Sequence, residues 1–86
     1  MTTTMLSIQV LLFAQLAEET GQDKLSLSLP HGCTVTDAIN ALIDMYPLFN
    51  EKKSQLAFAV NETYANPQLE LHDGDTVAII PPVSGG

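Results

Sequence analysis

The chain has 86 residues, 45% of them hydrophobic, and ten Asp and Glu against three Lys and no Arg give it a formal net charge of −7. A chain of this length forms one domain with a single core, so a binding or carrying role is favoured over a self-contained enzyme with an enclosed active site. The acidic surface disfavours nucleic acid and anionic membranes as partners and favours a protein with a basic docking surface, although the same charge also keeps a small protein soluble.

The first residues and the cysteine content indicate a cytoplasmic protein. Residues 1–4, MTTT, lack the positive start and long apolar run of a secretory signal, and no apolar run is long enough to span a bilayer. Cys33 is the only cysteine, so no internal disulfide can form. Its neighbour His31 makes a nucleophilic thiol conceivable, but we expect a small buried hydrophobe. His31 and His72 have no metal-site spacing, and no metal is expected.

The hydrophobic pattern of the N-terminal part predicts two strands joined by a short helical turn. The inward positions of the first strand alternate with Ser, Gln, Leu and Phe, and they are Leu6, Ile8, Val10 and Leu12. Residues 14–20 favour a short helical turn, which Gly21 stops. Leu25, Leu27 and Leu29 alternate with serines and predict the second strand, which Pro30 ends.

The segment after residue 34 predicts the main helix. Thr34 can cap it, Asp37 stands beside the positive end of its dipole, and neither Pro nor Gly follows until Pro47. Its apolar residues recur at three- and four-residue steps and are Val35, Ala38, Ile39, Leu42, Ile43 and Tyr46. A helix with one apolar face is expected to pack on a sheet.

The C-terminal half predicts further strands after a polar loop through Lys52 and Lys53. Residues 56–60 alternate as a third strand, Leu69 and Leu71 suggest a short one, and residues 76–80 form the last strand after a tight turn at 73–75. The resulting order is ββαβββ or close to it. It predicts an α+β domain of the β-grasp, or ubiquitin-like, fold, with a mixed sheet of about four to five strands packed on one main helix.

Residues 81–86 break the strand pattern and predict a flexible, extended tail beyond a β-grasp domain of residues 1–80. Pro81 and Pro82 cannot continue a central strand, and residues 84–86 carry almost no side chain. A thin backbone that ends in Gly-Gly can pass through a constriction and present its carboxylate to another protein's active site. The alternative is a frayed end without function.

The C-terminal motif resembles that of one family. Residues 73–86 are DGDTVAIIPPVSGG, in which a DGD turn, a hydrophobic strand and Pro-Pro-Val before the last Gly-Gly occur together. This combination is similar to the small subunits of molybdopterin synthase, the MoaD family of ubiquitin-like sulfur carriers. Residues 10–16, VLLFAQL, resemble the family's first strand and turn, and residues 60–63, VNET, resemble its third strand and the following loop. Residues 47–55 show hardly any resemblance.

The resemblance implies that the reactive group is the carboxylate of Gly86. In this family an ATP-dependent activating enzyme adenylates the last glycine, and sulfur then replaces the adenylate to give a thiocarboxylate. The tail is inserted into the large catalytic subunit, typically in a heterotetramer, where sulfur passes to cyclic pyranopterin monophosphate to build the molybdopterin dithiolene. No bound cofactor is implied, and the catalytic residues are expected on the large subunit. The residues implied to form the inserted tail are Pro81, Pro82, Val83, Ser84 and Gly85.

Strand alternation also predicts a docking face. If the inward side chains of the first and last strands face the helix, Phe13 and Ile80 lie on the opposite face, close to the tail. Tyr64, in the loop after the third strand, is expected near them. Exposed apolar side chains in one place indicate a partner surface, unless neighbouring groups cover them in the monomer.

Two other functions stay open. A sulfur carrier for thiamin biosynthesis, or a ubiquitin-related modifier, shares Gly-Gly and the activation chemistry but generally lacks Pro-Pro-Val. A β-grasp protein-binding module with an inert tail belongs to a different class. An inert tail tolerates added C-terminal residues, whereas a carrier does not, because its reactive group becomes an internal amide.

Overall fold

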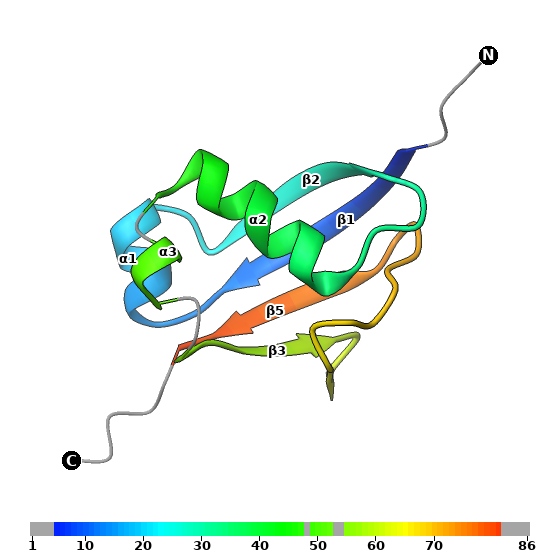
Figure 1. Cartoon of the computed structure of the whole chain (residues 1–86). Coiled ribbons are helices and arrows are strands. Elements are labelled where there is room, and N and C mark those ends of the chain that lie inside the picture. The colour runs from blue at the N-terminus through cyan, green and yellow to red at the C-terminus, as the bar shows by residue number, and fades with distance from the viewer. Residues whose placement is uncertain (1–4, 48, 53–54, 82–86) are drawn as a thin grey trace.

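The fold is built on one five-stranded sheet with strand order β2-β1-β5-β3-β4. The structure is a computed structural model, and it describes residues 5–47, 49–52 and 55–81. The strands are β1 (Met5–Leu12), β2 (Lys24–Pro30), β3 (Ala57–Val60), β4 (Thr63–Tyr64) and β5 (Thr76–Ile80). The helices are α1 (Gln15–Thr20), α2 (Val35–Met45) and α3 (Phe49–Lys52). Figure 1 shows α2 lying across one face of the sheet.

The sheet is mixed because its two central strands run parallel to each other. β1 pairs with β2 antiparallel and with β5 parallel, and β3 pairs antiparallel with both β5 and β4. The termini of the described chain therefore approach the sheet from opposite ends, as Figure 1 shows. The predicted α+β architecture, with one main helix on a mixed sheet, is confirmed.

The core lies between α2 and the sheet. The inward side chains of β1 are at most 3% exposed, and Val77 and Ile79 of β5 are fully buried. From α2 the core takes one helical face, and its buried residues are Val35, Ala38, Ile39 and Leu42. The inward side chains of the strands and the apolar face of the helix thus pack together in one layer, as predicted.

The first turn of α2 is fixed by a reciprocal capping box. The Thr34 hydroxyl oxygen accepts a hydrogen bond from the Asp37 N–H at 3.4 Å, and the Asp37 carboxylate accepts one from the Thr34 N–H at 2.8 Å. Two backbone donors that the helix leaves unpaired are thereby satisfied. The predicted caps are confirmed at both helices, since Gly21 ends α1 with φ 75° and donates its N–H to the Ala17 carbonyl at 2.9 Å.

The predicted strand at Leu69 and Leu71 is wrong, because this segment pairs with the start of α2 and not with the sheet. Only Glu70 forms a bridge, to Thr34, while the Leu71 N–H donates to the Cys33 carbonyl at 2.8 Å. Leu71 is 1% exposed and Leu69 is 44% exposed. The apolar residues at 69 and 71 therefore reflect the burial of Leu71 and not the hydrogen bonding of a strand. The fourth strand is β4 instead, which a two-residue loop joins to β3.

The segment after Pro47 was predicted to be a polar loop, and this is also wrong in part. Residues 49–52 form α3, and Phe49 is 1% exposed in the core. Its ring packs edge to face on Tyr46, with ring centroids 6.2 Å apart. A short segment that follows Pro47 carries no helical periodicity, so the sequence alone does not indicate that Phe49 is buried.

We expect Leu42→Ala to lower the free energy of unfolding by about 2–4 kcal/mol, because Leu42 is 1% exposed and its truncation leaves a cavity. Chemical denaturation of both proteins measures the difference. Asp44→Ala is the matched control, since Asp44 is exposed on the same helix, and its effect should stay within about 0.5 kcal/mol. A loss below about 1 kcal/mol for Leu42→Ala would contradict the assignment of this residue to the core.

Candidate functional site

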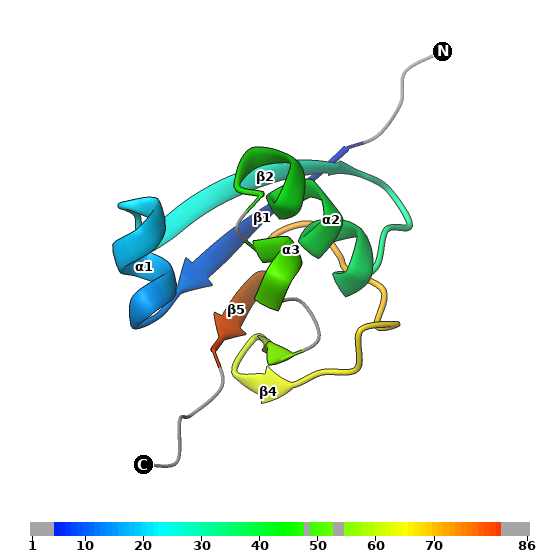
Figure 2. The same cartoon turned by 60° about the vertical axis from the view of Figure 1, so that its left-hand side comes forward.

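The face of the sheet opposite α2 presents a row of side chains, one from each strand. The register pairs Leu11 with both Lys24 and Ala78, and it continues through Ala59 to Tyr64. Paired residues point to the same side of a sheet. Figure 2 shows α2 and α3 on one side of the strands, so this row belongs to the other side, which we call the open face.

A hollow of about 520 Å³ runs along β5 on the open face. Seven residues line it: Leu11, Phe13, Asn61, Glu62, Thr76, Ala78 and Ile80. Phe13 is 46% exposed and Ile80 is half-buried, so the two predicted docking residues lie together in one hollow. Tyr64 is 77% exposed and shares the open face with Ala59, but it does not line the hollow. The docking role of all three residues stays a prediction.

A tight turn holds Phe13 at the end of β1. Its carbonyl accepts the Leu16 N–H at 3.0 Å, and Leu16, in the first turn of α1, is fully buried. Ala14, between them, has φ 51° and ψ −130°, a backbone region that mainly glycine occupies. The strained turn therefore ends β1 abruptly and leaves the Phe13 ring beside the hollow. No turn residue in the sequence marks this strain, so it was not predicted.

The other end of the hollow is closed by the β3–β4 turn, which Asn61 fastens to β5. The Asn61 side chain accepts the Thr76 N–H at 3.0 Å and donates to an Asp75 carboxylate oxygen at 2.9 Å. Its own N–H donates to the Thr76 carbonyl at 2.9 Å. The sequence indicates only a loop at Asn61, because its hydrogen-bond partners lie 14 and 15 residues away.

The Asp73-Gly74-Asp75 turn ties the start of β5 to β1. The Ser7 N–H donates to the Asp73 carboxylate at 2.7 Å, and the Gly74 N–H donates to the Ser7 carbonyl at 2.8 Å. Gly74 has φ 88°, which a side chain would strain. The DGD part of the C-terminal motif is therefore structural, since it sets where β5 begins.

The tail leaves the sheet next to the hollow. Leu12 pairs with Ile79, so the last residue of β5, Ile80, lies beside the Phe13 end of β1. Pro81 follows it and is half-buried. The remaining predicted tail residues, Pro82, Val83, Ser84, Gly85 and Gly86, lie outside the described residues, so the structure does not test their assigned roles.

Cys33 is part of the core and not of the open face. It is 6% exposed, and burial, followed by the Asp37 carboxylate, raises the pKa of its thiol above the ordinary value. A shallow hollow of about 340 Å³ lies beside it, lined by His31 and Asp37 among others. A thiol with a raised pKa stays protonated near neutral pH, which disfavours the nucleophilic role that the sequence left conceivable.

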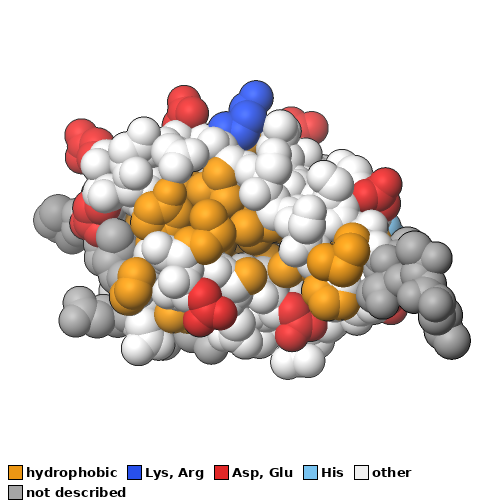
Figure 3. All heavy atoms as spheres, turned by 90° about the horizontal axis from the view of Figure 1, so that it is seen from above, with side chains coloured by type: hydrophobic (Ala, Val, Ile, Leu, Met, Phe, Trp, Pro, Cys, Tyr) orange, Lys and Arg blue, Asp and Glu red, His pale blue; other side chains and the backbone are white. Residues whose placement is uncertain are grey.

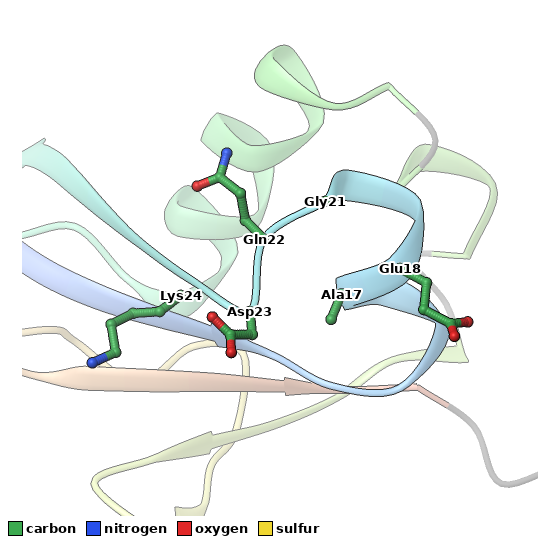
Figure 4. A pocket seen from close by; sticks show the side chains of 6 residues that line it. All are labelled: Ala17, Glu18, Gly21, Gln22, Asp23 and Lys24. Carbon is green, nitrogen blue, oxygen red and sulfur yellow. The ribbon is translucent and has the colours of Figure 1, made fainter.

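The remaining surface offers no convergent set of reactive groups among the residues that the structure describes. A hollow of about 540 Å³ lies between α1 and β2, where Figure 4 shows Glu18 and Lys24 pointing away from each other.

In Figure 3, acidic side chains surround an apolar area on the side seen from above. Within residues 5–47, 49–52 and 55–81 no group of three His, Cys, Asp or Glu could hold a metal. No described helix is long and apolar enough to cross a membrane.

Solved structures with the same arrangement include subunits of molybdopterin converting factor and small archaeal modifier proteins. A Pyrococcus furiosus protein assigned as molybdopterin converting factor subunit 1 superposes with a TM-score of 0.82 at 30% identity, covering 91% of this chain and 99% of that one. The protein SAMP1 from Haloferax volcanii gives 0.84 at 30% identity, with 93% and 99% covered. A complex of subunits 1 and 2 of the Helicobacter pylori molybdopterin-converting factor gives 0.64 at 21% identity, with 94% and 100% covered, and shows the fold alone.

Relatives by sequence match almost end to end. The molybdopterin synthase sulfur carrier subunit of Arabidopsis thaliana is 38% identical over 84 residues, which cover 98% of this chain and 88% of the relative. The protein of the same name from Homo sapiens is 33% identical over 82 residues, which cover 92% and 93%. The model of the ThiS family matches residues 10–86. The predicted β-grasp fold and the resemblance to molybdopterin synthase small subunits are thus confirmed, and the chain belongs to the ThiS family.

Proposed function

We propose that this chain is the sulfur carrier subunit of molybdopterin synthase and that Gly86 bears the sulfur. The observation that carries the proposal is the match over 98% of the chain to a relative of that name. The Pro-Pro-Val segment before Gly-Gly supports the same assignment. The geometry of the described domain agrees with it, because an apolar hollow lies beside the start of the tail.

The chemistry proceeds in two stages. The Gly86 carboxylate attacks the α-phosphate of ATP on the activating enzyme, and pyrophosphate leaves. The acyl adenylate carbon is then electrophilic, so a sulfide-level sulfur nucleophile displaces AMP and leaves a thiocarboxylate. On the large subunit the thiocarboxylate sulfur forms a bond to cyclic pyranopterin monophosphate, and water then hydrolyses the bond between the Gly86 carbonyl carbon and sulfur, which leaves the sulfur on the precursor and restores the carboxylate. Residues 82–86 have no titratable side chain, so the partner supplies any acid or base.

The domain's own part in this cycle is to position the tail. Docking of the open face places Pro81 at the entrance of the partner's active site, and two prolines reduce the conformational entropy that the tail loses on insertion. The assembly proposed here is a heterotetramer with the large subunit, and the similarity to relatives named as a subunit of molybdopterin synthase supports such a pairing. The activating enzyme binds the same tail, so the two partners exclude each other. The proposed compartment is the cytoplasm.

A protein modifier is the second candidate, because SAMP1, a small archaeal modifier protein, superposes as well as the Pyrococcus furiosus subunit and has the same 30% identity to this chain. A modifier would join its last glycine to a lysine of another protein through an isopeptide bond. A carrier would leave no such conjugate. Intact mass and conjugate analysis of the chain purified with its pathway enzymes distinguish the two functions.

Deleting Gly86 should abolish sulfur transfer and leave the thermal transition unchanged. The shortened chain still ends in a carboxylate at Gly85, but its carbon falls short of the reacting centre by about 3.5 Å, and near-attack geometry does not tolerate that error. Gly86→Ala keeps the length and should impair activation more than stability. The assay incubates each protein with activating enzyme, ATP and a sulfur donor, followed by intact mass and precursor conversion. Wild-type conversion by the deletion variant would remove Gly86 as the carrier residue.

Phe13→Ala and Ile80→Asp should each weaken binding to the large subunit by about 1–3 kcal/mol and leave the fold intact, because both side chains line the exposed hollow. Titration calorimetry measures the affinity, and circular dichroism checks the fold. Met45→Ala is the control, since Met45 is 50% exposed on α2, away from the open face. If both variants bind as wild type does, the open face is not the docking surface.

Cys33→Ser should retain sulfur transfer as long as the protein folds, because the thiol is buried and its pKa is raised. The same thiol should react more slowly with an alkylating reagent in the native protein than in denaturant. Thermal unfolding confirms that the variant is folded before activity is compared. A well-folded Cys33→Ser protein without activity would restore the nucleophile hypothesis.

A further inference from the structure

Glu62 occupies a backbone position that normally favours glycine. The Val60–Thr63 pair closes the β3–β4 hairpin with two residues, Asn61 and Glu62, whose φ angles are 51° and 70°. A two-residue hairpin loop with positive φ at both positions is typically Asn-Gly, because a β-carbon is strained there. Asn61 is explained by its bonds to β5. Glu62 needs another explanation.

The Glu62 side chain is exposed and has no partner within the part of the chain that the structure describes. It is the one charged residue among the seven that line the hollow. Asp75, which precedes β5, by contrast uses one carboxylate oxygen for the Asn61 amide and the other for the His72 N–H. The Glu62 carboxylate is therefore free to receive a group from outside, at the rim of an apolar surface.

We propose that Glu62 is a recognition residue of the docking face and that its carboxylate receives a Lys or Arg side chain of the large subunit. The inference rests on the proposed function and extends its interface. A charge pair at the edge of an apolar contact gains strength as water is excluded, and it fixes the register of the two surfaces. The net charge of −7 on the whole chain also favours a partner with a positively charged surface.

The position of Glu62 gives the pair a mechanical role. From Ile80 to Thr76, β5 spans about 13 Å at a rise of about 3.3 Å per residue, and Asn61 joins the turn to Thr76. Apolar contact at Phe13 and Ile80 holds the tail end of the hollow, and Glu62 holds the opposite end. Two contacts along one strand fix the direction in which the tail leaves β5. With a single contact, the domain could still rotate about that contact and the direction of the tail would not be fixed.

The test is the affinity of the full-length chain for the large subunit from the same source, measured at several salt concentrations. We expect Glu62→Gln to weaken binding about tenfold and Glu62→Lys at least about 100-fold, through loss and then reversal of the charge. Wild-type affinity should fall more steeply with salt than that of Glu62→Gln. Glu62→Gly should bind as weakly as Glu62→Gln without a lower thermal midpoint, since glycine relieves the strained φ.

Asp44→Asn is the matched control, because it removes one exposed negative charge from α2 on the other side of the sheet. Equal weakening by Asp44→Asn and Glu62→Gln would show an effect of net charge alone and overturn the inference. Wild-type affinity of Glu62→Gln and Glu62→Lys, with Phe13→Ala still weakened, would overturn it and leave the proposed docking face standing. If Phe13→Ala is also unchanged, the docking face itself fails.

Discussion

The parallel pairing of β1 with β5 is the contact on which the rest of the structure depends. These strands are far apart in sequence and central in the sheet, and their inward side chains are among the most buried in the chain. The ladder can form only if the chain between them crosses over, which α2 accomplishes by packing on the sheet. The DGD turn then sets the start of β5 through two bonds to Ser7. A change in the β1–β5 register would therefore disrupt both the core and the hollow.

The same pairing places the hollow beside the start of the tail. Because β1 and β5 run in the same direction, their C-terminal ends lie at the same end of the sheet, where Phe13 and Ile80 line one hollow. Successive side chains of a strand point to opposite faces of the sheet, so the residues that stabilise the core differ from those that form the open face. Substitutions in the hollow can therefore change the open face while the fold remains intact, and the proposed carrier, which binds two partners in turn, requires this separation.

Strain is concentrated at the two ends of the hollow. Ala14 follows Phe13, and Glu62 precedes the short strand β4; both have positive φ without being glycine. Positive φ at such residues persists only where the surrounding structure compensates for it, and it often accompanies function. Here the compensation is visible in the buried Leu16 on one side and the Asn61 bonds on the other. In the proposed carrier, these turns hold the surface that orients the tail, while the reaction takes place beyond it.

The amino-acid sequence by itself determined β1, β2 and α2 and the core residues that these elements contribute. Period-two alternation fixed β1 and β2, and helical periodicity with Thr34 and Asp37 fixed α2, because these signals are local. The C-terminal motif identified the family. Only the tertiary structure decided that Leu71 pairs with Cys33 and not with a strand, and that Phe49 enters the core through α3. It also decided that Asn61 and Glu62 close a hollow shared with Phe13, since contacts across the sheet leave no periodic trace in the chain.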